Sequence, residues 1–223
     1  MERFLPTNQS GFRKADGTVL QLTRIVHEIE RALDSGDTAF ACFYDLSKAF
    51  DKVWHAGLLA KLSHLGVADE ALKWITAYLT DRRQRVMING VLSNWLTIPA
   101  GVPQGSVLGP LLFLVYTHDL PTVVSTEVEC DQFADDTALI SIRASRTTAH
   151  DNLQESVNST GQWLSDWRLS VNAQKTFVVE FTRRSLPFPV SISLRGDVLP
   201  TSSTHRHLGL YFSHTLRWND HRS

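Results

Sequence analysis

Two adjacent carboxylates, Asp135 and Asp136, interrupt an apolar run that reads CDQFADDTALISI over residues 130–142. Two unit charges about 4–5 Å apart repel each other by roughly 3–4 kcal/mol at an effective dielectric constant near 20, and burial of either charge costs more. A solvated turn would explain the pair, because both charges would then remain in water. The apolar residues on both sides favour a bound cation instead, since the pair emerges from a buried strand.

A third carboxylate, Asp45, directly follows the hydrophobic run AFACFY at residues 39–44. Two strands that end in carboxylates can lie side by side in a sheet, so that their acidic side chains converge on one point. Oxygen ligands of this kind suit Mg²⁺ or Mn²⁺. A pair of such ions about 3.5–4 Å apart is the usual arrangement for in-line phosphoryl transfer. The three aspartates therefore predict a two-metal phosphoryl-transfer site.

The elements that position these carboxylates can be predicted from hydrophobic periodicity and turn residues. Helices are expected over residues 19–33, 51–66, 68–82, 109–120 and 147–167. Strands are expected at residues 39–44, on either side of Asp135, at 175–181 and at 205–212, with further hairpins at 84–98 and 190–200. Helices and mostly antiparallel hairpins alternate irregularly, which indicates an α+β fold rather than a doubly wound parallel sheet.

The composition is ordinary for a globular protein, with 43% hydrophobic and 20% charged residues in a chain of 223. The chain has 22 Lys and Arg residues and 23 Asp and Glu residues, so its net charge is close to zero. A protein that binds nucleic acid by itself usually carries a clear excess of basic residues, which this chain lacks. No apolar stretch reaches about 18 residues and no secretory signal is present, so we expect an intracellular protein, nuclear or cytoplasmic, without membrane contact. Cys42 and Cys130 are interpreted as small core residues of a reducing compartment, not as a disulfide or a zinc pair.

Five sequence motifs occur along the chain in a recognisable order. They are FYDLSKAFDKV, GVPQGSVLGPLLF, FADDTALI, LSVNAQKT and HLGLYF, and QSGFRK precedes them near the start. In order and spacing they resemble the motifs of reverse transcriptases, and in detail those of non-LTR (LINE-type) retrotransposons. The resemblance covers residues 8–213 and implies an RNA-directed DNA polymerase, which adds deoxynucleotides to a DNA primer on an RNA template.

The resemblance also implies the fold of a right-hand polymerase, with an antiparallel palm sheet, packed helices and partial fingers. We expect residues 1–213 to form the reverse transcriptase domain, with fingers at about 1–37 and 80–100 and palm for the remainder. Residues 214–223 would begin the following region. Because the chain stops right after the last motif, the thumb is expected to be absent, and other domains of the element are expected to be needed for full activity.

By the same resemblance, Asp45, Asp135 and Asp136 are the catalytic ligands of two Mg²⁺ ions, for which Mn²⁺ can substitute. The Leu46 carbonyl is implied to complete the shell of one ion. The ions would lower the pKa of the primer 3′-hydroxyl and stabilise charge on the reacting phosphates. Lys175 in NAQKT is implied to lie near the departing pyrophosphate as a general acid, although an exposed strand lysine is the simpler interpretation.

Phe50, Gln104 and Gly105 are implied to contact the incoming nucleotide. Phe50 would stack under the sugar and exclude a 2′-hydroxyl, whereas a core aromatic is the alternative. Gln104 would lie near the nucleotide and the template base, and Gly105 would let the backbone approach closely. The alternative for PQGS is a simple turn before a helix. Arg13 in QSGFRK is a candidate contact to the triphosphate, since a guanidinium matches phosphate geometry.

Two further groups are expected to contact nucleic acid, and one acidic residue is given a structural role. The candidate template contacts, which could also be a solvated charged helix end, are Arg82, Arg83 and Arg85. The residues that resemble a primer grip are Leu208, Gly209 and Leu210. Asp51 is interpreted as the N-cap of the helix that follows it, in preference to a metal ligand.

Two other functions remain open at this point. One is a catalytically inactive retroelement remnant or domesticated fragment that binds RNA or protein, and incorporation of dTTP on poly(rA)/oligo(dT) would distinguish it from a polymerase. The other is a different two-metal enzyme, such as a nuclease. A nuclease would leave the motifs around Phe50 and Gln104 as a coincidence.

Overall fold

The computed structural model describes residues 5–14, 16–183 and 190–216. The chain divides into two compact units, of which the first combines Met1–Ser47 with His118–Ser223 and the second is Lys48–Thr117. The mixture of helices and antiparallel strands agrees with the predicted α+β class.

The first unit is built on a four-stranded antiparallel sheet with strand order β6-β7-β1-β8. Its strands are β1 (Thr38–Tyr44), β6 (Val128–Phe133), β7 (Asp136–Arg143) and β8 (Phe177–Phe181). Every residue of β1 is buried, because β7 and β8 flank this strand and helices cover both faces of the sheet. This double burial explains why the sequence of β1 is apolar without alternation.

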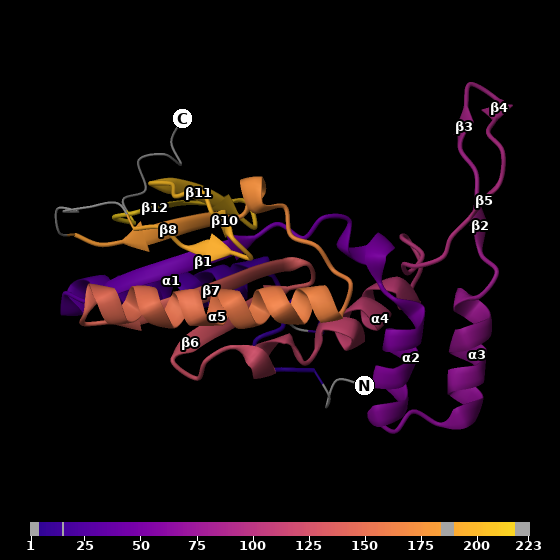
Figure 1. The fold of residues 1–223 in the computed structure, drawn as a ribbon, viewed down its shortest axis with the longest axis horizontal. Coiled ribbons are helices and arrows are strands. Elements are labelled where there is room, and N and C mark those ends of the chain that lie inside the picture. Colours follow the sequence, from indigo (N-terminus) through magenta and orange to yellow (C-terminus); the bar gives the residue numbers. More distant parts are fainter. Residues whose placement is uncertain (1–4, 15, 184–189, 217–223) are drawn as a thin grey trace. The chain divides into compact units, whose positions relative to one another are not determined.

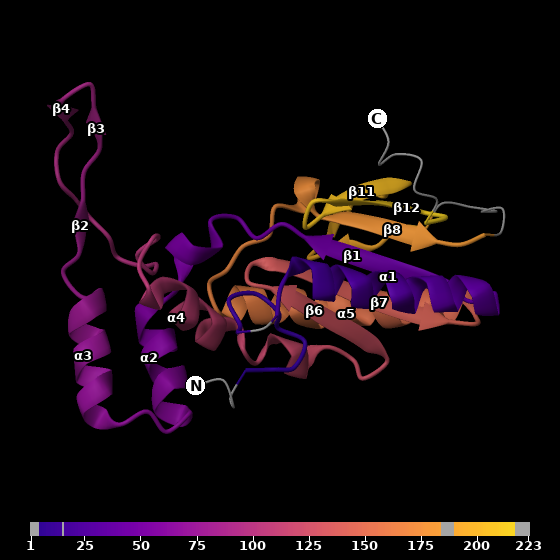
Figure 2. The same cartoon turned by 180° about the vertical axis from the view of Figure 1, so that it is seen from behind.

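Helices α1 (Thr18–Ser35) and α5 (Arg146–Asp166) cover opposite faces of this sheet, as Figures 1 and 2 show from the two sides. Helix α1 packs Ile25, Ile29 and Leu33 into the cluster that includes Ala41 and Phe43 of β1. It ends at a glycine in the left-handed conformation, whose N–H bonds to the last carbonyls of the helix. Helix α5 begins at a serine cap that accepts the N–H of Thr148.

Two short hairpins follow β8 in the first unit. They are β9 (Ser193–Leu194) with β10 (Asp197–Val198), and β11 (Thr204–His207) with β12 (Leu210–Ser213). The first hairpin turns at Arg195 and Gly196, as predicted. The prediction of a single strand over residues 205–212 is wrong, because Leu208 and Gly209 both adopt positive φ and reverse the chain.

Both outer edges of the sheet carry a short bridging segment of the chain itself. On the β6 side, Gln9 forms a parallel bridge with Gln132. On the β8 side, Thr201 forms a parallel bridge with Val178, whose backbone also bonds to Pro200 and Ser202. Three-ten helices η3 (Leu120–Val123) and η4 (Ala173–Lys175) complete the unit.

The second unit is mainly helical, with a long hairpin inserted before its last helix. Its helices are η2 (Ala49–Lys52), α2 (His55–His64), α3 (Asp69–Leu79) and α4 (Leu108–Thr117). Helix α2 begins four residues later than predicted, with Trp54 at its N-cap. The assignment of Asp51 as that cap is therefore wrong, because residues 49–52 form a separate three-ten turn.

The inserted hairpin pairs β2 (Arg83–Gln84) with β5 (Leu96–Thr97), and β3 (Met87–Ile88) with β4 (Val91–Leu92). It turns at Asn89 and Gly90, which have φ values of 50° and 80°, as the sequence predicts. Its side chains are exposed along almost the whole length. Among the described residues of both units, no helix combines the length and apolar character that a membrane span requires.

Candidate functional site

The three aspartates that the sequence singles out lie at one end of the sheet in the first unit. Asp45 directly follows β1, and Asp136 is the first residue of β7. Because Tyr44 pairs with Thr137 in the antiparallel register, Asp45 and Asp136 follow at the same end of two neighbouring strands. Asp135 belongs to the two-residue turn that joins Phe133 to Asp136. We call Ala134–Asp135 the carboxylate turn.

Partial burial and mutual repulsion disturb the ionisation of this group. Burial raises the pKa of Asp135, and the Asp45 carboxylate raises it further, against a backbone hydrogen bond that lowers it. Burial also raises the pKa of Asp136 to about 6, with Asp135 and Asp45 adding to the rise. The charge of Asp45 therefore acts on both Asp135 and Asp136.

This donor set fits a hard divalent cation by its chemistry, because it consists of carboxylate oxygens that repel one another. Its geometry is open. Within the described part of the chain, no group of three or more His, Cys, Asp and Glu side chains is arranged closely enough to hold a metal ion. A cation would have to draw the three side chains together.

The segment after Asp45 is fixed by the loop that carries Lys175. The Asp45 N–H donates to the Thr176 side chain at 3.1 Å, and its carbonyl accepts the N–H of Asn172 at 2.9 Å. Leu46 forms an antiparallel bridge with Val171. Lys175 itself is exposed at the end of η4. The structure therefore places the Lys175 loop directly beside the backbone of the first aspartate.

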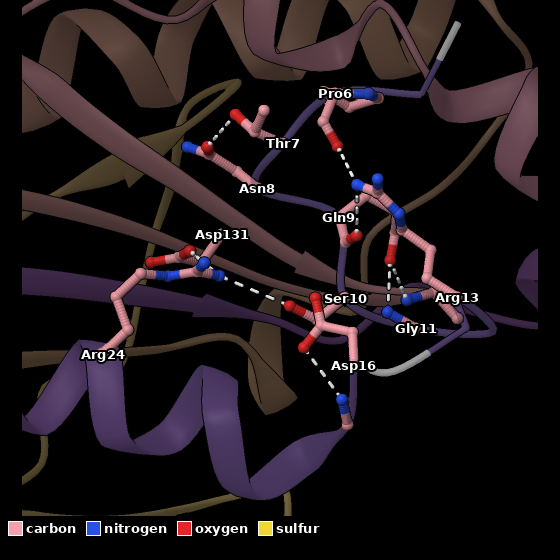
Figure 3. Close-up of polar contacts among 12 residues, drawn as sticks. Pro6, Thr7, Asn8, Gln9, Ser10, Gly11, Arg13, Asp16, Arg24 and Asp131 are labelled. Atoms are coloured by element: carbon pink, nitrogen blue, oxygen red, sulfur yellow. Dashed lines mark hydrogen bonds and ion pairs between the residues drawn. The ribbon is translucent and has the colours of Figure 1, made fainter. Parts of the chain in front are cut away.

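Arg13 lies in the N-terminal loop of the same unit, where its guanidinium serves the loop itself. One terminal nitrogen donates to the carbonyls of Pro6 at 2.9 Å and Gln9 at 3.3 Å (Figure 3). Asp16 accepts the N–H of Gly17 in the same region. The Gln9 side chain contacts the carboxylate turn, a role that sequence reasoning missed although QSGFRK drew attention to this segment.

A second cluster missed from the sequence joins α1, β6 and the N-terminal loop. Arg24 of α1 forms an ion pair with Asp131 of β6 at 3.0 Å and also reaches the Ser10 hydroxyl (Figure 3). The Asp131 side chain is 2% exposed. Burial raises its pKa to about 6 despite the attraction of Arg24. In the sequence, the only indication of this ion pair is the acidic residue Asp131 itself, which lies inside the apolar run before the carboxylate turn.

In the second unit, Phe50 stacks on Phe113 with ring centroids 4.3 Å apart and an interplanar angle of 21°. The Gln104 side chain donates to the Asp51 carboxylate at 2.9 Å. Gly105 has a φ of 76°, and no other atom lies within 4 Å of the position that a β-carbon would take there. Asp51, Gln104 and the arginines at 82 and 83 line one cavity of about 700 Å³. The structure thus gathers Gln104 and two of the candidate template arginines around a shared cavity.

The three candidate template arginines stack on aromatic rings of the same unit. The Arg82 guanidinium lies 5.2 Å from the Tyr78 ring centre, and Arg83 and Arg85 lie 5.7 and 4.4 Å from that of Trp95. Such contacts hold the charges in place while leaving them in solvent.

The primer-grip candidates form one tight turn in the first unit. Leu208 and Gly209 are its two left-handed residues, and Leu210 starts β12. Leu210 packs against the core cluster that contains Phe43 and Phe212. The turn is thereby anchored on the sheet that carries Asp45.

Similarity to known proteins extends over almost the whole chain. A family model described as reverse transcriptase (RNA-dependent DNA polymerase) matches residues 1–212. The RNA-directed DNA polymerase from mobile element jockey of Drosophila melanogaster is 35% identical and covers 97% of this chain and 24% of that protein. The probable RNA-directed DNA polymerase from transposon BS of Drosophila melanogaster is 37% identical and covers 98% of this chain and 25% of that protein. The chain therefore spans about a quarter of the length of these curated relatives.

Among solved structures, apo telomerase from Candida tropicalis, truncated from its C-terminal domain, is similar in fold. The TM-score is 0.61 at 11% sequence identity, over 93% of this chain and 40% of that chain. Telomerase from Candida albicans, in complex with a fragment of telomeric RNA, gives 0.53 at 17% identity over 84% of this chain and 35% of that chain. At these identities the likeness concerns the fold alone.

Proposed function

This chain belongs to the reverse transcriptase (RNA-dependent DNA polymerase) family, and we propose that it catalyses RNA-directed DNA synthesis for a non-LTR retrotransposon. The substrates would be deoxynucleoside triphosphates, a DNA primer and an RNA template. The observation that carries this proposal is the placement of Asp45, Asp135 and Asp136 at one end of the β1–β7 pair, where the charge of Asp45 raises the pKa of the other two. We further assign residues 1–37 and 80–100 to partial fingers and the remainder of 1–213 to the palm.

Asp45, Asp135 and Asp136 would hold two Mg²⁺ ions, or Mn²⁺ in their place, with help from the Leu46 carbonyl. When bound, such ions activate a hydroxyl nucleophile and stabilise charge on phosphate oxygens. The carboxylates contribute the negative charge that attracts the ions, and the raised pKa of Asp136, about 6, means that this side chain becomes fully ionised for ion binding only above that pH. Lys175 would donate a proton to the leaving pyrophosphate from its exposed position at the end of η4.

The second unit would supply recognition of nucleotide and template. Phe50, held by its stack on Phe113, would face the sugar and exclude a 2′-hydroxyl. Gln104 and Gly105 would contact the nucleotide, and the arginines at 82, 83 and 85 would contact template phosphates. In the first unit, Arg13 would contact the triphosphate, and Leu208 to Leu210 would position the primer end.

The central test is Asp135→Asn in a primer-extension assay with poly(rA)/oligo(dT), dTTP and Mg²⁺ or Mn²⁺. We expect a loss of at least about 1,000-fold, because several kcal/mol of charge stabilisation depend on the ions that this carboxylate would hold. Asp197→Asn, on the exposed β10 turn, serves as a matched control with full activity. Substantial Mg²⁺-dependent synthesis by the Asp135 variant would refute the assignment.

Sugar selection is tested with Phe50→Val, measured as kcat/KM for dTTP relative to UTP. We expect this ratio to fall because a smaller side chain leaves room for the 2′-hydroxyl. Unchanged discrimination would assign Phe50 to the core together with Phe113.

The general-acid role is tested with Lys175→Gln. We expect kcat to fall with little change in KM, and the loss of rate at alkaline pH to disappear, because the titrating donor is gone. An unchanged pH profile would contradict the role.

Template contact is tested by measuring the salt dependence of RNA binding after replacing the arginines at 82, 83 and 85 with Gln. Three lost phosphate contacts should flatten the slope of log K against log salt by about 2 on a single strand. Arg195→Gln, on an exposed turn in the first unit, is the control. An unchanged slope would assign the three arginines to a solvated face.

A further inference from the structure

The side-chain oxygen of Gln9 lies at the carboxylate turn. It accepts the backbone N–H of Ala134 at 3.0 Å and that of Gly11 at 2.8 Å, the second of which is visible in Figure 3. Gln9 is 1% exposed and Ala134 is 4% exposed. A single amide oxygen therefore satisfies two backbone donors in a place that water does not reach readily.

The carboxylate turn has a strained backbone that needs such support. Ala134 adopts a φ of 57°, in the left-handed region that a residue with a β-carbon avoids. Strained residues of this kind persist only where their surroundings fix them. Asp135 follows directly, so the conformation of Ala134 sets the direction in which the Asp135 side chain leaves the turn.

The position of Gln9 is itself fixed by the strand beside it. The N–H of Ser10 donates to the Gln132 carbonyl at 2.8 Å, and the N–H of Gln132 donates to the Asn8 carbonyl at 2.9 Å. The loop approaches the turn so closely that a β-carbon on Gly11 would lie 2.5 Å from the Ala134 nitrogen. Only glycine fits at that point, and Gln9 is held against the turn by backbone pairing.

We propose that Gln9 is a positioning residue, which fixes the carboxylate turn and through it the side chain of Asp135. It would act through its hydrogen bond to the backbone of Ala134 and not through contact with a substrate or an ion. The consequence for ion binding rests on the proposed polymerase function, whereas the consequence for the turn does not. The N-terminal QSG segment thereby gains a function in the first unit that is separate from any contact of Arg13 with a nucleotide.

The test compares Gln9→Leu, which removes the acceptor at similar size, with Gln9→Glu, which keeps an acceptor oxygen. Gln154→Leu is the matched control, because Gln154 also accepts a backbone N–H, from Ser193 at 2.8 Å, far along the chain from the turn. Hydrogen exchange of the Ala134 amide is measured by NMR on ¹⁵N-labelled protein. Mn²⁺ affinity is measured by calorimetry, and primer extension gives kcat and the KM for Mg²⁺.

We expect Gln9→Leu to speed exchange at Ala134 at least about tenfold, with exchange in β1 unchanged, because the lost bond opens the turn locally. Mn²⁺ affinity should fall at least about threefold and the KM for Mg²⁺ should rise correspondingly, because Asp135 would be less well placed. Gln9→Glu should retain slow exchange, and Gln154→Leu should match the wild type throughout. Should Gln9→Leu fail to fold, Gln9→Asn, which withdraws the oxygen by one methylene, carries the same comparison.

Wild-type exchange at Ala134 in the Gln9→Leu protein would overturn the proposal. Faster exchange together with unchanged Mn²⁺ affinity and unchanged KM for Mg²⁺ would also overturn it, since the turn would then not govern Asp135. Failure of the wild type itself to bind Mn²⁺ and extend primers would instead refute the proposed function. The exchange result would then decide the positional role of Gln9 alone.

Discussion

Replacement of Asp131 by Asn should change how the stability of the protein depends on pH. The Asp131 carboxyl is buried in β6, and its pKa is raised from 3.8 to about 6, mainly by burial. Arg24 lowers the pKa, while Glu129 and Glu28 raise it further. One carboxyl oxygen has no hydrogen-bond partner among the described residues, which is consistent with an incompletely compensated charge.

The direction in which stability changes with pH follows from the difference in proton binding between the folded and the unfolded state. Between the two pKa values, the folded protein holds a proton on Asp131 that the unfolded chain has lost, so stability falls as pH rises through this window. The full effect is about 3 kcal/mol, and about 1.4 kcal/mol of it falls between pH 5 and pH 8. Above pH 8 Asp131 is ionised in both the folded and the unfolded state, so its contribution to stability no longer changes with pH.

The assay is urea unfolding of wild type and Asp131→Asn at several pH values from 5 to 8. The difference between the two free energies of unfolding should change by about 1.4 kcal/mol over this range, in favour of the variant at higher pH. Asp197→Asn, at an exposed position, should run parallel to the wild type. Parallel curves for wild type and Asp131→Asn would refute the reasoning, because they would mean that the buried carboxyl binds its proton no more tightly than in the unfolded chain.

Three further predictions concern an ion pair, two glycines with left-handed backbone and the two cysteines. Arg146→Met should destabilise the protein by about 3–5 kcal/mol in urea unfolding, because it removes the 2.5 Å partner of the buried Glu180, and replacing Glu180 by Leu as well should recover most of the loss. Gly196→Ala should cost about 1–2 kcal/mol for its left-handed backbone, whereas Gly101→Ala should cost more, because its β-carbon would also lie 2.7 Å from the Asp51 carbonyl oxygen. Equal costs would contradict that clash. Both cysteines are buried, and burial raises their thiol pKa values, so a thiol reagent should label them only after unfolding; labelling of the native protein within minutes would show that they are accessible.

Local sequence signals predicted the elements well where the deciding interactions are local. The apolar run of β1, the helical spacing of α1 and the Asn89–Gly90 turn each correspond to an observed element. The pairing of the two strands next to Asp45 and Asp136 was also anticipated, because each apolar run has a carboxylate at one end. Burial of both cysteines without a disulfide agrees with their interpretation as core residues.

The misses arose where distant residues decide the local structure. Asp51 has the residue type and spacing of a helix cap. Its carboxylate instead accepts a hydrogen bond from the Gln104 side chain, and helix α2 begins only at His55. Leu208 adopts a positive φ, which a leucine does not favour. In the sequence, only the following glycine, Gly209, therefore indicates the β11–β12 turn. The contact of Gln9 with the carboxylate turn joins residues 125 positions apart, and no periodicity encodes it.

The bridges on the two outer strands have a consequence for how molecules behave toward one another in concentrated solution. Unpaired strand edges are templates for intermolecular pairing and aggregation. The backbone around Gln9 occupies part of the β6 edge, and the backbone around Thr201 occupies part of the β8 edge, so a neighbouring molecule cannot extend the sheet there without displacing them. A chain that began after Gly11 would leave the edge of β6 uncovered. We expect such a chain to aggregate through this edge, which would be measured as turbidity that increases with protein concentration.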